Sequence, residues 1–427
     1  MADSRTYRFF CLAALALPAL VFLLTQWRYA ANVPYWDDIT QILWMLNQVL
    51  TSDGSSLNQV EDPDALHALF YPNAGHIPLL TRLFGLLQFA LGGMDFRVAM
   101  AVAGGAWVLG FCGLLWEARR SLPLPALIPL PFLAFSLSQW EAMNMMLGSW
   151  QMYVGTLLLP LGALAALVRG HPLLAGGLFA AGLFGSAGAL AVMPLALAWC
   201  LLQRQWRQLG LFLLLALPAL LWFLHCNPQQ APRADGQQVL DQLYFAAVFL
   251  GNIYGAGSYD LKPLAPLHLA TGCLLLALGV TALFLNRRQP LFQLVFLYTL
   301  LLALMTALKR SEQTWVVPRY SVFALLCAAS VYVLWMDLLQ RQWQLAPAAR
   351  HVVLAVATAA SLALWLHNYP QGSRLLAQDQ VNRQQALRAY AEEGDCSRLM
   401  WDPLWCRDTL ESAKKLGLFD YQRAAAE

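Results

Sequence analysis

Long apolar runs recur along almost the whole chain, and they limit the folds that it can adopt. Of the 427 residues, 59% are hydrophobic and 12% are charged, whereas soluble globular proteins carry about 25% charged residues. A transmembrane helix needs roughly 20 predominantly apolar residues, and in lipid only helices and closed barrels satisfy their backbone hydrogen bonds. Because the runs are continuous and do not alternate, the sequence predicts an all-α polytopic membrane protein.

The distribution of charge predicts how this protein is oriented. When the apolar runs are divided into about eleven spans, the linkers on the N-terminal side carry eleven Lys/Arg and three acids, and the other side carries sixteen and twenty-one. The positive-inside rule then places the N-terminus in the cytoplasm and the C-terminal segment outside. The expected spans are 9–26, 97–116, 123–139, 152–168, 171–185, 187–202, 209–225, 266–285, 290–308, 320–337 and 350–367.

One further apolar segment, 76–93 (HIPLLTRLFGLLQFALGG), is ambiguous. If it were a twelfth span, every later linker would change sides and the basic linkers would lie outside. We therefore expect an interfacial helix with Arg82 at the surface, and a tilted span remains the alternative. No dinucleotide or P-loop glycine motif occurs, and we expect no nucleic-acid partner.

The first outer loop, 27–96, contains two adjacent acids, Asp37 and Asp38, shortly after the first span. Apolar residues recur at helical spacing behind them, which predicts an amphipathic surface helix over 38–50. One acid would cap this helix, but a cap needs only one. Two neighbouring carboxylates near a bilayer repel each other, which raises a pKa or recruits a cation. We therefore expect at least one of them to be functional.

Other polar residues gather on the same side. Asn73, His76 and Arg82 supply an amide, an imidazole and a guanidinium within ten residues, and Glu141 is the sole charged residue between 121 and 168. A charge at such a depth is expensive and therefore indicates function, although exposure of Glu141 to outer water is an equal alternative.

A cationic cluster, formed by Lys309, Arg310 and Arg319, is expected on the acid-rich outer side. Guanidinium and ammonium groups at a membrane surface suit a phosphate. Snorkelling of long basic side chains at the ends of spans is the alternative.

The C-terminal part differs from the rest. We expect a transmembrane domain over 1–367 and a small, polar, outer tail over 368–427. Cys396 and Cys406 lie in that tail, where an oxidising compartment would allow a disulfide. No Cys/His spacing resembles a zinc site.

Taken together, these features resemble the GT-C superfamily of integral-membrane glycosyltransferases, in particular the arabinosyl- and mannosyltransferase-like branch that uses polyprenyl-phosphate sugars. "WDD" matches the acidic dipeptide that follows the first span in that family, and 73–93 resembles a run found in bacterial relatives, with Asn73, His76, Pro78 and Arg82 retained. "EAMNMMLGSWQ" resembles a motif in the second outer loop of these relatives, through Glu141, Asn144, Gly148 and Gln151. "PRY" resembles the start of a late span there, through Arg319 and Tyr320.

The resemblance implies an inverting transfer of one sugar at the periplasmic face of a bacterial inner membrane, to a glycan, lipid or glycoprotein acceptor. Asp37 would be the general base, and Asp38 would raise its pKa or cap the helix. The cationic cluster would stabilise the departing phosphate. Asn73, His76, Arg82, Glu141, Asn144, Gln151 and Tyr320 would contact the substrates. A divalent cation at the acid pair is an alternative that we do not favour, and we expect no other metal or cofactor.

Three rival hypotheses remain. A transporter of a lipid-linked glycan predicts inverted halves and polar residues at the midplane, and the sequence has neither. An oligosaccharyltransferase or O-antigen ligase would share the cationic cluster, but it typically needs a larger late outer loop than 309–319. A purely structural membrane partner would leave the paired acids unexplained.

Overall fold

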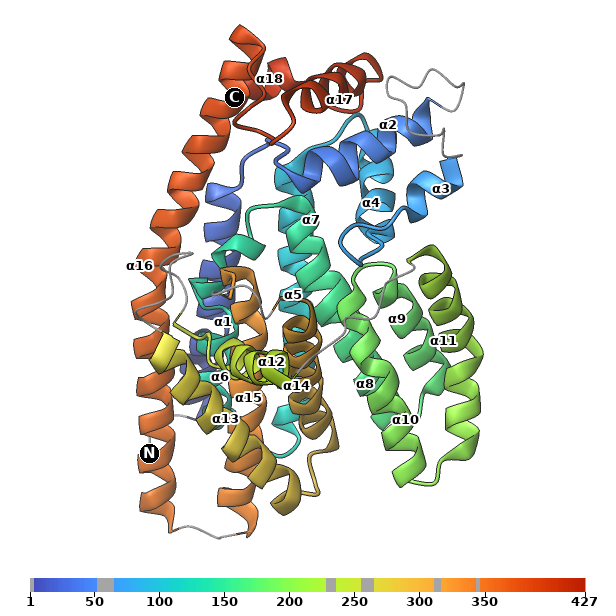
Figure 1. Ribbon diagram of the computed structural model, residues 1–427. Helices are drawn as coiled ribbons and strands as arrows, with labels where there is room; N and C mark the ends of the chain where they lie inside the picture. The colour runs from blue at the N-terminus through green and yellow to red at the C-terminus, as the bar shows by residue number, and fades with distance from the viewer. Residues whose placement is uncertain are drawn as a thin grey trace.

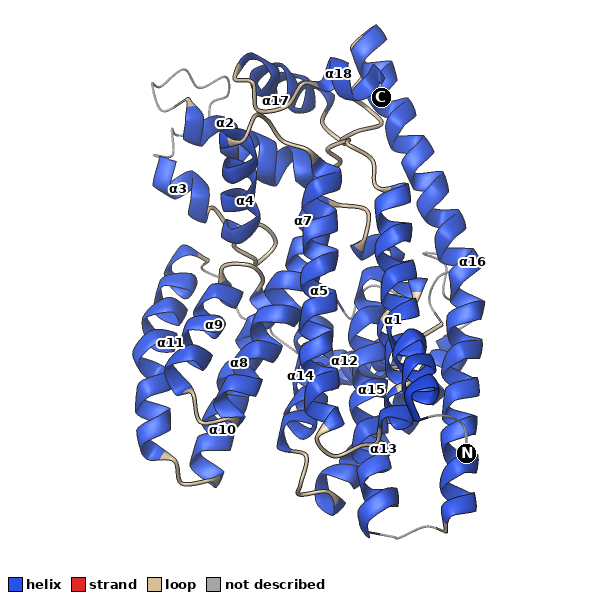
Figure 2. Ribbon diagram, turned by 180° about the vertical axis from the view of Figure 1, so that it is seen from behind, coloured by secondary structure: helices blue, strands red, loops and turns tan. Residues whose placement is uncertain are grey.

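The computed structural model describes residues 4–51, 65–227, 236–254, 265–310, 316–342 and 346–426. Every regular element in these ranges is a helix, so the all-α prediction is confirmed (Figure 2). The two termini lie at opposite ends of the molecule (Figure 1). The described part of residues 27–96, which we call the outer loop after its expected position, shares the end at the top of Figure 1 with the C-terminal helices.

Eight helical segments within the described residues are long and apolar enough to cross a membrane, and the chain is a multi-pass membrane protein. Two of the eight are composite, because short 3-10 or π turns join their parts. The eight are α1 (Ser4–Tyr29), α5 (Phe96–Arg119), α7–η4–α8 (Met146–Ser149, Trp150–Leu158, Leu159–Val168), α11 (Trp206–Cys226), α13 (Ala265–Leu285), α14 (Pro290–Arg310), η6–α15–η7 (Pro318–Tyr320, Ser321–Asp337, Leu338–Gln342) and α16 (Pro347–Glu393).

Three of the eleven expected spans are shorter than a membrane crossing requires, so the count of eleven is not confirmed. The expected span 123–139 is broken where four prolines, which lack a backbone N–H, separate 3-10 turns from a short helix. The three short segments are η2–α6 (Leu124–Leu127, Pro129–Ala134), α9 (Pro172–Leu183) and η5–α10 (Ala187–Ala191, Val192–Leu202). A further 3-10 helix, η3 (Leu137–Ala142), follows α6. The helix α12 (Gly236–Leu250) was not predicted.

The helix α16 changes the expected division of the chain. It continues for 47 residues, so the boundary expected between 367 and 368 falls inside one unbroken helix. It ends at Gly394, whose φ of +74° is a left-handed conformation that glycine adopts readily. In Figure 1 it runs along one edge of the whole molecule and reaches α17 (Pro403–Lys415) and α18 (Tyr421–Ala426). We call residues 394–426 the C-terminal cap.

The helix expected over 38–50 is present as η1 (Asp38–Leu43) and α2 (Trp44–Leu50), near α3 (Ala65–Phe70) and α4 (Leu79–Ala90). Its apolar face does not lie on a lipid surface. Residues such as Ile42 and Leu46 are fully buried and belong to one hydrophobic cluster with Leu410 and Leu418 of the C-terminal cap. The cap therefore covers the helix that follows the acid pair.

Candidate functional site

A cavity of about 400 Å³ lies between α11 and α14, beneath the loop that carries His76. This volume is in the range of small-molecule sites, roughly 300–1,000 Å³. Along α14 the lining changes from apolar Leu302 and Met305 to basic Lys309 and Arg310. The cavity therefore combines an apolar interior with a cationic end.

A tight turn presents His76 to this cavity. The N–H of Asn73 donates to the carbonyl of His76 at 2.7 Å, and the reverse bond has the same length. Between them Ala74 and Gly75 have φ values of +47° and +88°, as a type I′ turn requires at both central positions. The side-chain amide of Asn227, which also lines the cavity, donates to the carbonyl of Gly75. Asn73 thus shapes the turn through its backbone and is not part of the cavity lining.

The imidazole of His76 is oriented by its surroundings. Its Nδ1 accepts the backbone N–H of Ala187 at 3.0 Å and lies 3.3 Å from the hydroxyl of Ser186, which bonds to Thr156. Burial, reinforced by the cations Lys309, Arg310 and Arg319, lowers the pKa of His76 to about 4. The ring is therefore neutral near pH 7, and its proton is on Nε2.

Two of the three expected cations, Arg310 and Arg319, lie next to one aromatic ring. The guanidinium carbons of Arg310 and Arg319 lie 5.7 and 5.6 Å from the ring centroid of Tyr320, within cation–π range. Lys309 and Arg310 occupy the last turn of α14, where the helix dipole favours positive charge. Neither forms an ion pair with a carboxylate in the described part of the chain.

Glu141 pairs with the third cation. Its carboxylate accepts a bond from Arg319 Nη1 at 2.5 Å and another from the Arg319 backbone N–H at 3.3 Å. Glu141 is buried and is not part of the cavity lining. It neutralises Arg319 and fixes its position, which leaves Lys309 and Arg310 as the cations that face the cavity.

The two adjacent acids have different surroundings. Asp38 is buried and accepts the backbone N–H groups of Met146 at 3.3 Å and Leu147 at 2.8 Å. It therefore caps the start of α7 and not its own helix. Burial raises the pKa of Asp38 to about 6, against the lowering effect of the N–H of Leu147.

Asp37 accepts no hydrogen bond from the residues that the structure describes, nor does its side chain cap η1. The residue is exposed, but the surrounding protein partly desolvates its carboxylate and raises its pKa, and the charges of Arg319 and Arg310 oppose that rise. The preceding residue, Trp36, has a φ of +49°, and its N–H donates to Leu399 of the C-terminal cap at 3.1 Å. Asp37 thus has a free carboxylate that faces the cationic cluster.

A polar cluster on α16 was not predicted from the sequence. The Asn144 amide donates to Asp379 at 2.9 Å, and Arg383 pairs with Asp379 and donates to the Asn144 carbonyl. Arg383 also lies 4.4 Å from the ring centroid of Tyr35 and lowers the pKa of Asp38. The i, i+4 spacing of Asp379 and Arg383 was a readable signal, but nothing local connected it to the acid pair. Asn144 therefore contacts Asp379 and Arg383 of α16, and it supports the acid pair indirectly through Arg383.

Arg82 was expected at the surface, and the structure corrects this placement; its expected role in substrate binding stays a prediction. Its side chain is fully buried, and it donates to the carbonyls of Gln41, Ala68, Leu69 and Tyr71. These bonds join η1, the end of α3 and α4. Arg82 holds the outer loop together and is not part of the cavity lining.

Four polar residues of the cavity were not predicted: Thr156, Ser186, Asn227 and Thr306. Ser186 lies in a small-residue break, GSAG, between two apolar runs. A Cβ placed on Gly155 would lie 2.6 Å from the backbone of Gly185, so this break packs directly against η4. Gln151 does not line the cavity; its backbone carbonyl accepts the hydroxyl of Thr156.

The acid pair does not suit a divalent cation. Within the described residues, no group of three or more His, Cys, Asp and Glu could hold a metal ion. Both Asp38 oxygens already accept backbone N–H groups, and Asp37 faces two guanidinium groups. A cation such as Mg²⁺ prefers several converging oxygen ligands, and this donor set does not provide them.

Comparison with solved structures identifies one with the same architecture. The chain is similar to the crystal structure of ArnT from Cupriavidus metallidurans bound to undecaprenyl phosphate, with 14% sequence identity and a TM-score of 0.52. The match covers 91% of this chain and 80% of that chain. No protein-family model matches the chain, and no curated protein is similar to it in sequence. The GT-C-like fold that the sequence resemblance implied is confirmed over nearly the whole chain.

Proposed function

We propose that this protein is a membrane glycosyltransferase that moves a single sugar from a polyprenyl-phosphate donor to an acceptor at the outer face of a bacterial inner membrane. The observation that carries the proposal is the cavity whose apolar interior ends at Lys309 and Arg310. Asp37 is not part of the cavity lining, but its carboxylate interacts electrostatically with Arg310 and Arg319. The similarity in fold to a protein that was crystallised with undecaprenyl phosphate supports the choice of donor.

The donor fits the cavity by its chemistry. The apolar side chains along α14 and α11 suit isoprenoid units, whose burial is worth roughly 25 cal/mol per Å². The phosphate suits the basic end, where Lys309 and Arg310 form charge-assisted bonds and the neutral His76 offers a further N–H donor. The sugar would then lie beyond the phosphate, toward Asp37.

The reaction is a single displacement. A hydroxyl oxygen of the acceptor forms a bond to the anomeric carbon, and the bond from that carbon to the phosphate oxygen breaks. The electron pair leaves with the polyprenyl phosphate, where Lys309 and Arg310 stabilise the growing negative charge. The hydroxyl proton passes to Asp37, the general base. The anomeric configuration is inverted. Asp38 and Glu141 hold the neighbouring helix and Arg319 in place.

The experiment measures release of polyprenyl phosphate and labelling of acceptor in proteoliposomes. Undecaprenyl-phosphate pentose and hexose donors are supplied with glycolipid and glycan extracts from the cell envelope. Asp37→Asn should lower transfer by about 10²–10⁴-fold, the usual contribution of a general base, and leave the melting midpoint unchanged. The matched control is Asp95→Asn, because Asp95 caps α5 in the same outer loop; it should lower stability and keep transfer. Full activity of Asp37→Asn would refute the assigned base, and no transfer from any donor would refute the function.

A further inference from the structure

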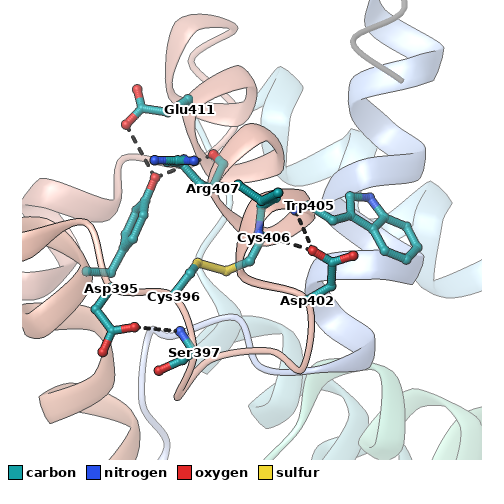
Figure 3. The surroundings of a disulfide bond; sticks show 10 residues. Asp395, Cys396, Ser397, Asp402, Trp405, Cys406, Arg407 and Glu411 are labelled. Carbon is teal, nitrogen blue, oxygen red and sulfur yellow. Dashed lines mark hydrogen bonds between the residues drawn. A yellow bond between two sulfur atoms is a disulfide. The ribbon is translucent and has the colours of Figure 1, made fainter. Parts of the chain in front are cut away.

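A second cavity lies apart from the first, between α2 and α17 of the C-terminal cap. Its volume is about 350 Å³, again within the range of small-molecule sites. Trp44 and Trp405 line it, with ring centroids 5.5 Å apart and planes almost perpendicular at 88°. Figure 3 shows Trp405 at the start of α17, pointing away from the disulfide between Cys396 and Cys406. The two indoles supply apolar faces beside polar groups.

Two buried polar atoms in this cavity have no hydrogen-bond partner among the residues that the structure describes. Asn47 is 3% exposed and its Oδ1 accepts no hydrogen bond, although its amide donates to the Thr409 carbonyl. Thr409 is 2% exposed, and its hydroxyl is also without a partner. A buried polar group left unpaired costs about 1–3 kcal/mol. Both side chains line the cavity, so a ligand with hydroxyl groups would satisfy them there.

The combination of groups narrows the class of ligand. A sugar ring has an apolar C–H face, which can pack on the electron-rich face of an indole, and hydroxyls that both donate and accept. Asn47 and Thr409 meet those hydroxyls, and Asp408 and Lys415, which also line the cavity, extend the polar rim. A purely apolar ligand would leave the buried amide and hydroxyl unpaired, and a simple anion would make no use of the indole faces.

The position of the cavity connects it to the proposed reaction. The helix α2 continues η1, which begins at Asp38, so residues 44–51 lie 7–14 residues beyond Asp37 along one helical axis. At about 1.5 Å per residue, the second cavity is on the order of 10–20 Å from the acid. A ligand that filled this cavity and still placed a hydroxyl at Asp37 would be a chain of several sugar units.

We propose that the cavity between Trp44 and Trp405 binds a sugar unit of a glycan acceptor, at a distance from the hydroxyl that receives the new sugar. The assignment as acceptor rests on the proposed function; the carbohydrate site itself rests on the two indoles and the unpartnered Asn47 and Thr409.

The test measures binding before transfer. The full chain in nanodiscs is titrated with linear hexose and pentose oligosaccharides of two to four units and with delipidated envelope polysaccharide, and both intrinsic tryptophan fluorescence and saturation-transfer NMR are followed. We expect saturable binding by at least one glycan. Thr409→Val, which keeps the shape and removes the hydroxyl, and Trp405→Ala should each weaken it at least tenfold. Trp206→Ala, a change at an exposed tryptophan on α11, is the matched control and should bind as the wild type does.

The outcomes separate this inference from the proposed function. Asp37→Asn should keep full glycan binding, and Thr409→Val should raise the KM for the acceptor with little change in kcat. Glycan binding that depends on Trp405 and Thr409 would support the carbohydrate site even if no donor gave transfer. Absence of saturable binding by every glycan, or equal binding by Thr409→Val, Trp405→Ala and the wild type at unchanged melting midpoints, would overturn it.

Discussion

Two titratable groups of the outer loop should make opposite contributions to the pH dependence of stability. His76 has a pKa of about 4 in the folded protein, against an ordinary 6.5. As the pH falls from 6.5 to 4, the unfolded chain takes up a proton on His76 before the folded protein does. Stability is therefore lost over this window. The difference between the two pKa values corresponds to about 3 kcal/mol, at about 1.36 kcal/mol for each pKa unit.

Asp38 acts in the opposite direction. Its pKa is about 6 in the folded protein, against an ordinary 3.8, so the folded protein takes up a proton on Asp38 first. Stability is gained as the pH falls from 6 to 4, by about 3 kcal/mol on the same scale. Asp38 is buried and His76 is partly buried, so solvent screening reduces the value for His76 more than the value for Asp38. In the wild type the two contributions to stability nearly cancel. A variant that removes one of the two groups should therefore show the contribution of the remaining group.

The assay is chemical unfolding of the protein in detergent micelles at pH 7 and pH 4. From pH 7 to pH 4, His76→Gln should gain about 3 kcal/mol relative to the wild type, and Asp38→Asn should lose about 3 kcal/mol relative to it. His351→Gln, a change at an exposed histidine of α16, is the matched control and should follow the wild-type curve. If both variants ran parallel to the wild type over this range, burial would not govern these two pKa values, and the reasoning would fail.

Three further predictions follow from single contacts. Lys309→Gln and Arg310→Gln should each raise the KM for a polyprenyl-phosphate sugar about 10–100-fold in transfer kinetics, because a hydrogen bond to a charged group is worth about 1.5–3 kcal/mol; a KM at the wild-type value would contradict the phosphate site. Arg82→Met should lower the free energy of unfolding by at least about 2 kcal/mol, because it removes the buried guanidinium that bonds to four backbone carbonyls; a loss of transfer at unchanged stability would instead indicate substrate contact. Cys396→Ser should destabilise the C-terminal cap by about 2–4 kcal/mol, measured by faster hydrogen exchange over 394–426, and unchanged exchange would show that the cap does not depend on the disulfide.

Much of the fold could be predicted because it depends on local composition. Hydropathy identified every one of the eight long apolar segments, and helical spacing identified the helix over 38–50. The failures have local causes as well. A hydropathy window averages over prolines, so it did not detect the break in 123–139, and Asp241 interrupts the apolar run of α12. The expected boundary at 367 followed a change in polarity, but a helix continues through such a change until a residue such as Gly394 ends it.

The partners of the site residues could not be predicted, because they come from distant parts of the chain. Glu141 and Arg319 are 178 residues apart, and Asp38 meets Leu147 109 residues away. The sequence shows that an isolated acid and a group of cations need partners, but it does not show which of them meet. Arg82 is the clearest example: a basic residue near a bilayer is usually expected to reach water, whereas here carbonyls at the end of α3 surround it.

The contacts of Asp38 and Trp36 explain why two acids are adjacent at this point of the chain. Asp38 anchors η1 to the start of α7 through two backbone N–H groups, and that anchor fixes the residue before it. Trp36, tied to the C-terminal cap at Leu399, restrains the chain on the other side. Asp37 therefore lies between two fixed neighbours, and within the described ranges it accepts no hydrogen bond that would have to break before it takes up a proton. A single acid could not both cap α7 and act as a free base, because both oxygens of the capping carboxylate already accept backbone N–H groups and are not available to an acceptor hydroxyl.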